Sequence, residues 1–257
     1  MCEKHPLNKT LLNIKEQSPL VHNITNYVVM NNTANALLAI GASPVMAHAL
    51  EEVEDMVSIA AALVINMGTL SEKWVDAMLL AAKRAKALGK PIVFDPVGVG
   101  ASQFRTETAQ KIIQAATPTV IRGNASEIMA LAQMANSTKG VDSAHASQDA
   151  IAAAQQLSNT LANTIVISGA TDYIISGAQI SEVSEGSPMM AKVTGMGCTA
   201  TAIIGACLGV EADAHMAACA AMQIMGLTGQ AAAELSLGPG SFQMNFLDQL
   251  FQLQDKA

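Results

Sequence analysis

Charged side chains are scarce in this chain of 257 residues: Asp, Glu, Lys and Arg make up 14% of it, against roughly 25% in an ordinary soluble domain. Aromatic residues contribute only 3%, whereas hydrophobic residues reach 51%. Such a hydrophobic chain is not intrinsically disordered, because disordered chains cannot bury enough apolar surface to fold. The formal net charge of −7 argues against a nucleic-acid-binding protein, since nucleic-acid affinity depends on clustered Lys and Arg.

Cysteine is sparse as well, with four residues at Cys2, Cys198, Cys207 and Cys219. No two of them have the C-x-x-C spacing of a zinc or redox site, and a disulfide scaffold is excluded by so low a content. Cys207 and Cys219 lie in apolar stretches with helical patterns, where a thiol behaves as a small hydrophobic group. The first residues lack the apolar core of a signal peptide, so we expect a cytoplasmic protein.

One long uncharged run needs a test against a membrane-spanning helix. Residues 193–210 hold no charge, and 18 residues is near the lower limit for crossing a bilayer. The run contains four glycines and three threonines and is bounded by Lys192 and Glu211. We therefore predict a buried helix in a protein interior and no membrane span.

Short β-branched runs alternate with longer Ala-rich stretches along the chain. The runs 62–66, 91–95, 119–122 and 164–168 are continuously apolar, as expected for strands that are covered on both faces. Helices are predicted from Ser71 to Leu88, from Asn124 onward, and from Ser147 toward Leu157. This alternation predicts an α/β fold with a mostly parallel central sheet and helices on both faces. No linker divides the chain, so we expect residues 1–257 to form a single domain.

Polar residues and glycines follow the predicted strands. These strand ends are 43–46, 66–68, 95–98, 122–124 and 168–169. Ligands of open parallel sheets bind outside the carboxyl ends of the strands. A sheet with a purely structural role would not need Asp95, Arg122 and Ser168 at this edge, although helix capping accounts for some such residues.

The segment Gly195-Met196-Gly197-Cys198 is the sharpest local signal. It is predicted to follow a strand at Val193 and to begin a long buried helix, whose free N–H groups would form an anion hole. The two glycines would let the backbone approach a ligand closely. Cys198 would lie in the first helical turn, where the helix dipole is expected to lower its pKa.

The same segment also matches the dinucleotide pattern G-x-G-x-x-A, which leaves a nicotinamide-dependent oxidoreductase open as an alternative. That fingerprint requires a second strand ending at an acidic residue. Residues 211–221 are instead predicted to continue as helix, and the segment lies late in the chain. NAD(P) binding without ATP binding would decide for this alternative.

Six motifs follow one another between about residue 20 and about residue 250, at 21–26, 41–46, 95–100, 121–127, 195–198 and 238–242. In this order they resemble one family, the hydroxyethylthiazole kinases of thiamin salvage, within the ribokinase-like superfamily. Met196 and Ser168 depart from the residues usual in the family. The first departure changes only a side chain beside backbone N–H groups, and the second keeps a hydroxyl.

The resemblance implies transfer of the ATP γ-phosphoryl group to the hydroxyl of 4-methyl-5-(2-hydroxyethyl)thiazole, with Mg²⁺. It also implies a homotrimer with active sites near the subunit interfaces. Thiazole contacts are implied for Met46, Gly195, Asn26 and Gly68, and ATP contacts for Arg122 and Ser168.

The residues themselves suit this chemistry. Asp95 and Glu127 are hard oxygen ligands suited to Mg²⁺, directly or through water. We hypothesise that Cys198 assists deprotonation of the substrate hydroxyl, although positioning dominates if the transition state is loose. A related kinase for hydroxymethylpyrimidine and a non-catalytic binding protein of the same fold remain as alternatives.

Overall fold

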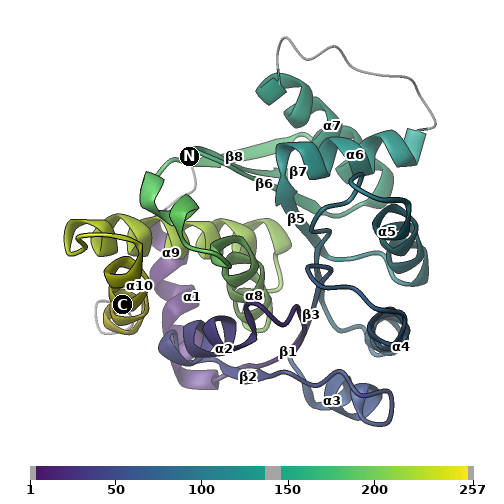
Figure 1. Ribbon diagram of the computed structural model, residues 1–257, viewed down its shortest axis with the longest axis horizontal. Helices are drawn as coiled ribbons and strands as arrows, with labels where there is room; N and C mark the ends of the chain where they lie inside the picture. The colour runs from purple at the N-terminus through teal and green to yellow at the C-terminus, as the bar shows by residue number, and fades with distance from the viewer. Residues whose placement is uncertain (1–3, 137–145, 254–257) are drawn as a thin grey trace.

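The four apolar runs predicted to be strands form neighbouring strands at the centre of one sheet (Figure 1). They are β3 (Ala62–Asn66), β4 (Ile92–Asp95), β5 (Val120–Asn124) and β6 (Thr164–Ser168). The structure, a computed structural model, describes residues 4–136 and 146–253. The sheet also contains β1 (Leu20–Ile24), β2 (Ser43–Val45), β7 (Asp172–Ser176) and β8 (Gln179–Val183).

The strand order is β2-β1-β3-β4-β5-β6-β7-β8. Pairing is parallel from β2 through β6, which confirms the mostly parallel sheet, and antiparallel from β6 to β8. The β7–β8 hairpin turns at Gly177, which has a positive φ of 59°, a conformation that glycine adopts at little cost. At the other edge, β2 has only three residues and includes Pro44, which carries no backbone N–H group.

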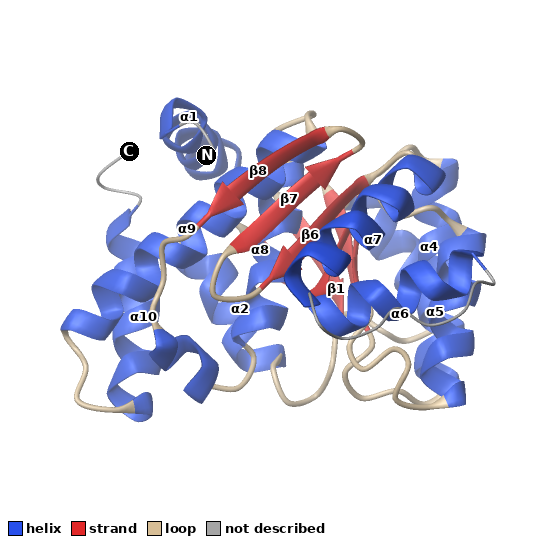
Figure 2. Cartoon of the chain, turned by 90° about the horizontal axis from the view of Figure 1, so that it is seen from above, coloured by secondary structure: helices blue, strands red, loops and turns tan. Residues whose placement is uncertain are grey.

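Side chains of the central strands alternate between two buried layers. Val64, Val93 and Val166 pack into one layer, while Ile65, Phe94 and Ile165 pack into the other. The first layer is completed by α1 (Lys4–Gln17), α2 (Met30–Ala39), α8 (Met196–Leu208), α9 (Ala214–Glu234) and α10 (Pro239–Leu253). The second is completed by α3 (Val53–Ile59), α4 (Glu72–Ala87), α5 (Gln103–Ala115), α6 (Ala125–Asn136) and α7 (Ala146–Leu161). Figure 2 shows helices on both sides of the strands, as the sequence predicted.

The helix ends that were predicted from capping residues are confirmed. Ser71 is the N-cap of α4, and its Oγ accepts a hydrogen bond from the Trp74 N–H. Gly89, just beyond the end of α4, has a positive φ of 65°, as expected for a glycine that stops a helix. Asn124 immediately precedes α6 and accepts a hydrogen bond from the Glu127 N–H at 2.9 Å. The third predicted helix corresponds to α7, which begins at Ala146.

Two predictions around α8 are wrong. Val193 is not in a strand: residues Pro188–Lys192 form the 3-10 helix η2, capped by Ser187 and started by Pro188. Residues 211–221 are not one continuous helix either, because α8 ends at Leu208 and α9 begins at Ala214. Asp213 is the N-cap that starts α9 as a separate helix, since its carboxylate accepts hydrogen bonds from two backbone N–H groups in the first turn of α9.

Candidate functional site

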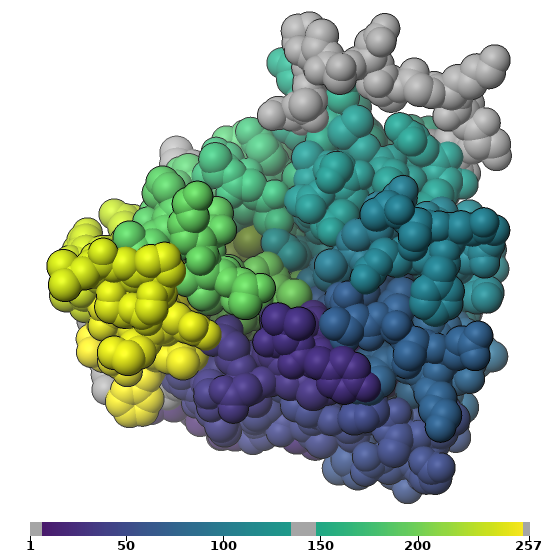
Figure 3. Space-filling model, viewed as in Figure 1, coloured from purple at the N-terminus to yellow at the C-terminus, as the bar shows by residue number. Residues whose placement is uncertain are grey.

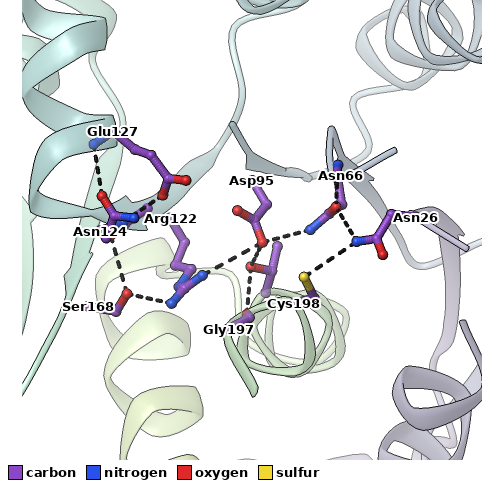
Figure 4. A network of polar contacts seen from close by, with 12 residues as sticks. Asn26, Asn66, Asp95, Arg122, Asn124, Glu127, Ser168, Gly197 and Cys198 are labelled. Atoms are coloured by element: carbon purple, nitrogen blue, oxygen red, sulfur yellow. Dashed lines mark hydrogen bonds and ion pairs between the residues drawn. The ribbon is translucent and has the colours of Figure 1, made fainter. Parts of the chain in front are cut away.

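The carboxyl ends of the strands bring polar side chains from distant parts of the sequence together. Asn66, Asp95 and Ser168 are the last residues of β3, β4 and β6, and Arg122 lies in β5. Figure 4 shows Asn66, Asp95, Arg122 and Ser168 directed toward the first turn of α8. The predicted convergence of polar residues at this edge is therefore confirmed. Figure 3 shows a hollow on this side of the molecule, bordered by green residues around α8 and by teal residues.

Asp95 is the centre of the polar network. Its side chain is fully buried, and its Oδ2 atom accepts hydrogen bonds from Asn66 Nδ2 and Thr201 Oγ1, both at 2.8 Å. Arg122 Nη1 lies 3.7 Å from the same oxygen. The other oxygen, Oδ1, is buried without a hydrogen-bond partner. Burial raises the pKa of Asp95 to about 6, although the Arg122 charge and the two hydrogen bonds oppose the shift.

Arg122 lies against the start of α8. Its Nη2 donates a hydrogen bond to Ser168 Oγ, so the two residues that the family resemblance assigned to ATP are in direct contact. A Cβ atom added to Gly197 would lie 2.5 Å from Arg122 Nη1, closer than any real contact. Gly197 is therefore required for the guanidinium group to approach the helix terminus.

The first turn of α8 presents backbone N–H groups. Gly195 is the N-cap with a φ of 88° and provides no side-chain cap. The hydrogen bond from Thr199 N–H to Gly195 O spans 2.8 Å and starts the helix. The N–H groups of Met196, Gly197 and Cys198 precede it and lie at the positive end of the helix dipole. This geometry suits an anion.

Cys198 lies on the opposite side of this turn from Arg122 (Figure 4). Its Sγ accepts a hydrogen bond from Asn26 Nδ2 at 3.5 Å. The expectation of a lowered thiol pKa is wrong in this state of the protein. Burial and the negative charge of Asp95 raise the pKa of Cys198, and they outweigh hydrogen bonds from Asn66 and Asn26 and the charge of Arg122. The thiol is therefore protonated at neutral pH.

Asn26 and Gly68 are in contact. A Cβ atom on Gly68 would lie 2.4 Å from Asn26 Nδ2, so glycine makes room for that amide. Met46 directly follows β2 and is half-buried. The next residue, Ala47, is bonded through its carbonyl oxygen to His22 Nε2 at 2.8 Å. His22 is fully buried.

Glu127 has a capping role in the structure. Its Oε1 accepts a hydrogen bond from Gly98 N–H at 2.8 Å, and its Oε2 accepts one from Asn124 N–H at 2.9 Å. With the Asn124 side chain bonded to the Glu127 N–H, the pair forms a capping box. The box fixes the Glu127 carboxylate close enough to Asp95 for the two charges to interact.

The described residues hold no group of three His, Cys, Asp or Glu side chains that could bind a metal ion. A magnesium site in a nucleotide-dependent enzyme needs fewer, because one or two carboxylates and the substrate phosphates complete the coordination. The buried and unpartnered Oδ1 of Asp95 fits such a ligand. Glu127 fits less directly, since both of its oxygens already accept hydrogen bonds.

Sequence reasoning missed three residues that organise the site. Asn66 was noted only as a strand end, and Thr201 only as part of an apolar helix, yet both donate to Asp95. Arg105 of α5 was not singled out. Its guanidinium donates to the carbonyl oxygens of Met67, Gly68 and Val97 and thereby ties together the loops after β3 and β4. The sequence shows that an Asn ends a strand, but it does not show which side chains that Asn will contact.

The start of α8 does not continue as a dinucleotide-binding fold. That fingerprint needs a second strand ending at an acidic residue that binds ribose. Here the acidic residue, Asp213, caps α9 instead. Within the described residues, no helix is both long and apolar enough to cross a membrane.

Comparison with known proteins agrees with this geometry. The family model described as the hydroxyethylthiazole kinase family matches residues 11–256. A hydroxyethylthiazole kinase of Leptospira biflexa serovar Patoc is 54% identical over 240 residues, covering 93% of this chain and 90% of that protein.

Solved structures show the same relationship. The hydroxyethylthiazole kinase protein of Pyrococcus horikoshii OT3 superposes with a TM-score of 0.89 at 40% identity, covering 96% of this chain and 92% of that chain. A ribokinase-like superfamily protein of Enterococcus faecalis V583 superposes with a TM-score of 0.69 at 14% identity, covering 99% and 94%, and shows the fold alone. The chain therefore has a ribokinase-like fold and belongs to the hydroxyethylthiazole kinase family.

Proposed function

We propose that this protein transfers the γ-phosphoryl group of ATP to the hydroxyl group of 4-methyl-5-(2-hydroxyethyl)thiazole, the reaction of thiamin salvage. The open first turn of α8 carries the proposal. Arg122 and Ser168 lie on one side of this turn, and Cys198 and Asn26 lie on the other. A phosphoryl group on the turn would therefore have a nucleotide on one side and an acceptor alcohol on the other.

Phosphoryl transfer depends mainly on positioning and on neutralising the charge of the transferring group. The N–H groups of Met196, Gly197 and Cys198 form the anion hole and donate to the equatorial oxygens. Arg122, held by Ser168 and Asp95, adds positive charge on the nucleotide side. Asn26, Gly68, Met46 and the backbone of Gly195 bind and orient the thiazole.

Asp95 and Glu127 are the residues that would hold Mg²⁺ together with a bound nucleotide. Asp95 would offer its unpartnered Oδ1, and Glu127 would act through water, because its two oxygens accept backbone hydrogen bonds. When bound, the ion neutralises phosphate charge. The carboxylates and Arg122 keep this side of the site polar and separate from the half-buried alcohol side.

Cys198 is proposed to contact the substrate hydroxyl and, in its thiolate form, to accept the hydroxyl proton as the phosphoryl group is transferred. Only the thiolate can accept this proton, and the raised pKa makes the thiolate a minor form at neutral pH, so a base role would act through that minor form and would increase with pH. If Cys198 is the base, Cys198→Ser lowers kcat strongly while Cys198→Asp retains activity. Equal kcat values for the wild type and Cys198→Ser would remove this role and leave positioning as its function.

We also propose that the chain acts as one catalytic domain and assembles as a homotrimer. The family resemblance supports the trimer, as do large exposed apolar side chains on the α9–α10 side, among them Leu235, Leu237 and Met244. Light scattering coupled to gel filtration measures the assembly. A monomer at micromolar concentration contradicts it.

ADP formation by the purified protein tests the proposed reaction. Mg-ATP is supplied with and without hydroxyethylthiazole, and the product mass is checked for an added phosphate. Thiazole-dependent ADP with a phosphorylated product supports the proposal. Turnover with hydroxymethylpyrimidine alone would keep the phosphoryl site and overturn the thiazole assignment, whereas no turnover with either alcohol would favour a binding protein.

A further inference from the structure

Asn66 lies between the alcohol side of the site, formed by Asn26, Gly68 and Cys198, and the phosphate side around Asp95. The proposed reaction assigns no role to it. It is the last residue of β3 and is 1% exposed. Its Oδ1 accepts hydrogen bonds from Asn26 Nδ2 at 2.8 Å and from Gly68 N–H at 2.9 Å. Its Nδ2 donates to Asp95 Oδ2 at 2.8 Å. One carboxamide therefore joins the alcohol side to the buried carboxylate (Figure 4).

These partners allow only one orientation of the Asn66 amide. Two donors face its oxygen, and a carboxylate faces its nitrogen. A flipped amide would place its NH₂ group against both donors and its oxygen against the carboxylate, leaving buried polar groups unpaired. The amide is therefore held in place from both sides.

The orientation of Asn66 helps to decide which Asp95 oxygen is free. Asn66 and Thr201 both donate to Oδ2, and Arg122 approaches the same atom. Oδ1 is left without a partner. Without these donors, the carboxylate would be free to rotate, and its unpartnered oxygen would no longer have a fixed direction.

The alcohol side depends on the same amide. Asn26 has two N–H hydrogens on Nδ2, and its contacts are with Asn66 Oδ1 and Cys198 Sγ. Asn66 thus holds the amide that reaches the Cys198 sulfur. It also bonds the backbone of Gly68, which has to remain close to Asn26.

We infer that Asn66 is a positioning residue that couples the alcohol side of the site to the phosphate side, with Thr201 as its partner on Asp95. The inference rests on the proposed phosphotransferase function. Asn66 fixes Asn26 and Gly68 through its oxygen and directs Asp95 Oδ1 toward the phosphates and Mg²⁺ through its nitrogen. Thr201 touches none of the proposed reacting groups, whereas Asn66 also interacts with the Cys198 thiol, so its position bears on both sides of the site.

Asn66→Asp keeps the contacts that Asn66 makes through its oxygen and removes the hydrogen bond that it donates to Asp95. The new carboxylate has the same shape and still accepts from Asn26 and Gly68, but it cannot donate to Asp95 and places a like charge beside it. Thr201→Val removes the second donor to Asp95 with little change of volume and leaves Asn66 intact. Asn163→Asp is the matched control, because Asn163 is a half-buried Asn that precedes β6, at the opposite end of that strand from Ser168.

The readout is ADP affinity with and without Mg²⁺, measured by calorimetry at pH 8, together with kcat and KM for the thiazole. Loss of ligand-orienting partners typically costs about 10- to 100-fold in metal affinity or activity. We expect Asn66→Asp to lose a factor of this size from the Mg²⁺-dependent part of ADP binding and from kcat. ADP affinity without Mg²⁺ and the KM for thiazole stay near the wild-type values. Thr201→Val shows a smaller loss in the same quantities, and Asn163→Asp shows none.

The inference would be overturned if Asn66→Asp and Thr201→Val both kept the wild-type kcat and the wild-type effect of Mg²⁺ on ADP affinity. So would equal losses in ADP affinity with and without Mg²⁺, which indicate general damage. If Asn66→Asp shows no cooperative thermal unfolding, Thr201→Val decides by the same readouts. If the wild type binds Mg-ADP but does not phosphorylate the thiazole, the proposed function fails while the binding measurements still decide the role of Asn66.

Discussion

The starts of α8 and α9 are two polar sites within the same layer of the protein, and they differ in how completely their groups are bonded. At the start of α9, Asp213 caps two backbone N–H groups, and both ring nitrogens of His215 have serine partners at 2.9 Å. At the start of α8, Gly195 provides no side-chain cap. Beside it, Asp95 Oδ1 and Arg122 Nε are buried without hydrogen-bond partners.

Complete hydrogen bonding indicates a structural role for the cluster around His215, and incomplete hydrogen bonding indicates a functional role for the cluster around Asp95. Buried polar groups are normally paired, because an unpaired one loses its hydration without compensation. The His215 cluster obeys that rule and stabilises the contact of α9 with β7 and β8. The α8 cluster violates it at the groups that would meet a charged ligand. The unpaired atoms of two charged side chains beside an uncapped helix start therefore indicate a binding site, and each variant below tests one side of the comparison.

The largest effect is expected from Gly197→Ala at the start of α8. The added methyl group would overlap Arg122 and displace its guanidinium group from the anion hole. Loss of one stabilising donor in such a site lowers kcat by roughly 100- to 1,000-fold. Steady-state kinetics measure the change. Gly240→Ala is the control, since a Cβ atom there meets no atom within 4 Å, and equal kinetics for the two variants would contradict the crowding argument.

Asp95→Asn is expected to abolish activity and to remove a pH dependence of the protein's stability. The pKa of Asp95 is raised from 3.8 to about 6 in the folded protein. Folding therefore binds a proton in this range, and the carboxylate reduces stability as pH rises from about 4 through about 6. Removing the carboxylate should remove this pH dependence, so the stability of the variant relative to the wild type should rise by about 3 kcal/mol between pH 3 and pH 8. Urea unfolding at the two pH values measures this, and the same difference in stability at both pH values would contradict it.

His215→Leu should lower the stability and leave kcat unchanged. Ser181 would lose its bond to the imidazole, while Ser176 would keep its bond to Thr164. Leaving one such buried group unpaired costs about 1–3 kcal/mol. Burial also lowers the pKa of His215, so wild-type stability falls as pH drops below the unfolded value of about 6.5. That part of the pH dependence should disappear in the variant. A changed kcat with normal stability would show that the cluster has a functional role.

The smallest effect is expected from Asp213→Ala. The carboxylate that accepts from His215 N–H and Met216 N–H is removed, and loss of an N-cap costs about 1 kcal/mol. Chemical denaturation measures the loss, and kcat should match the wild type. A much larger loss would indicate that Asp213 does more than cap the helix.

The sequence predicted the four central strands and the mostly parallel sheet because its strands and helix ends carry local signals. The central strands are uninterrupted β-branched runs, and Ser71, Gly89 and Asn124 mark helix ends through their own backbone chemistry. The β7–β8 hairpin and η2 were missed, since their short polar and apolar stretches resemble loops and strands equally well. Local patterns do not distinguish a 3-10 turn from a strand.

The site was predicted only as far as residue type and strand position allow. Asp95, Arg122 and Ser168 stand at strand ends, so their convergence followed from the parallel topology. The contacts of Asn66 and Thr201 with Asp95 depend on how α8 packs on the sheet, which no local pattern records. The Cys198 pKa was misjudged because the helix dipole is visible in the sequence, whereas burial is not.

Pro44 in β2 has a consequence for how copies of this chain can meet. An edge strand with free N–H and C=O groups is a template for adding another strand, and open edges of this kind promote aggregation. β2 offers three residues and lacks one donor at Pro44, so it is a poor template. Growth of the sheet from one molecule into the next is blocked at this end, and strand-swapped or fibrous association is disfavoured there even when the protein is concentrated.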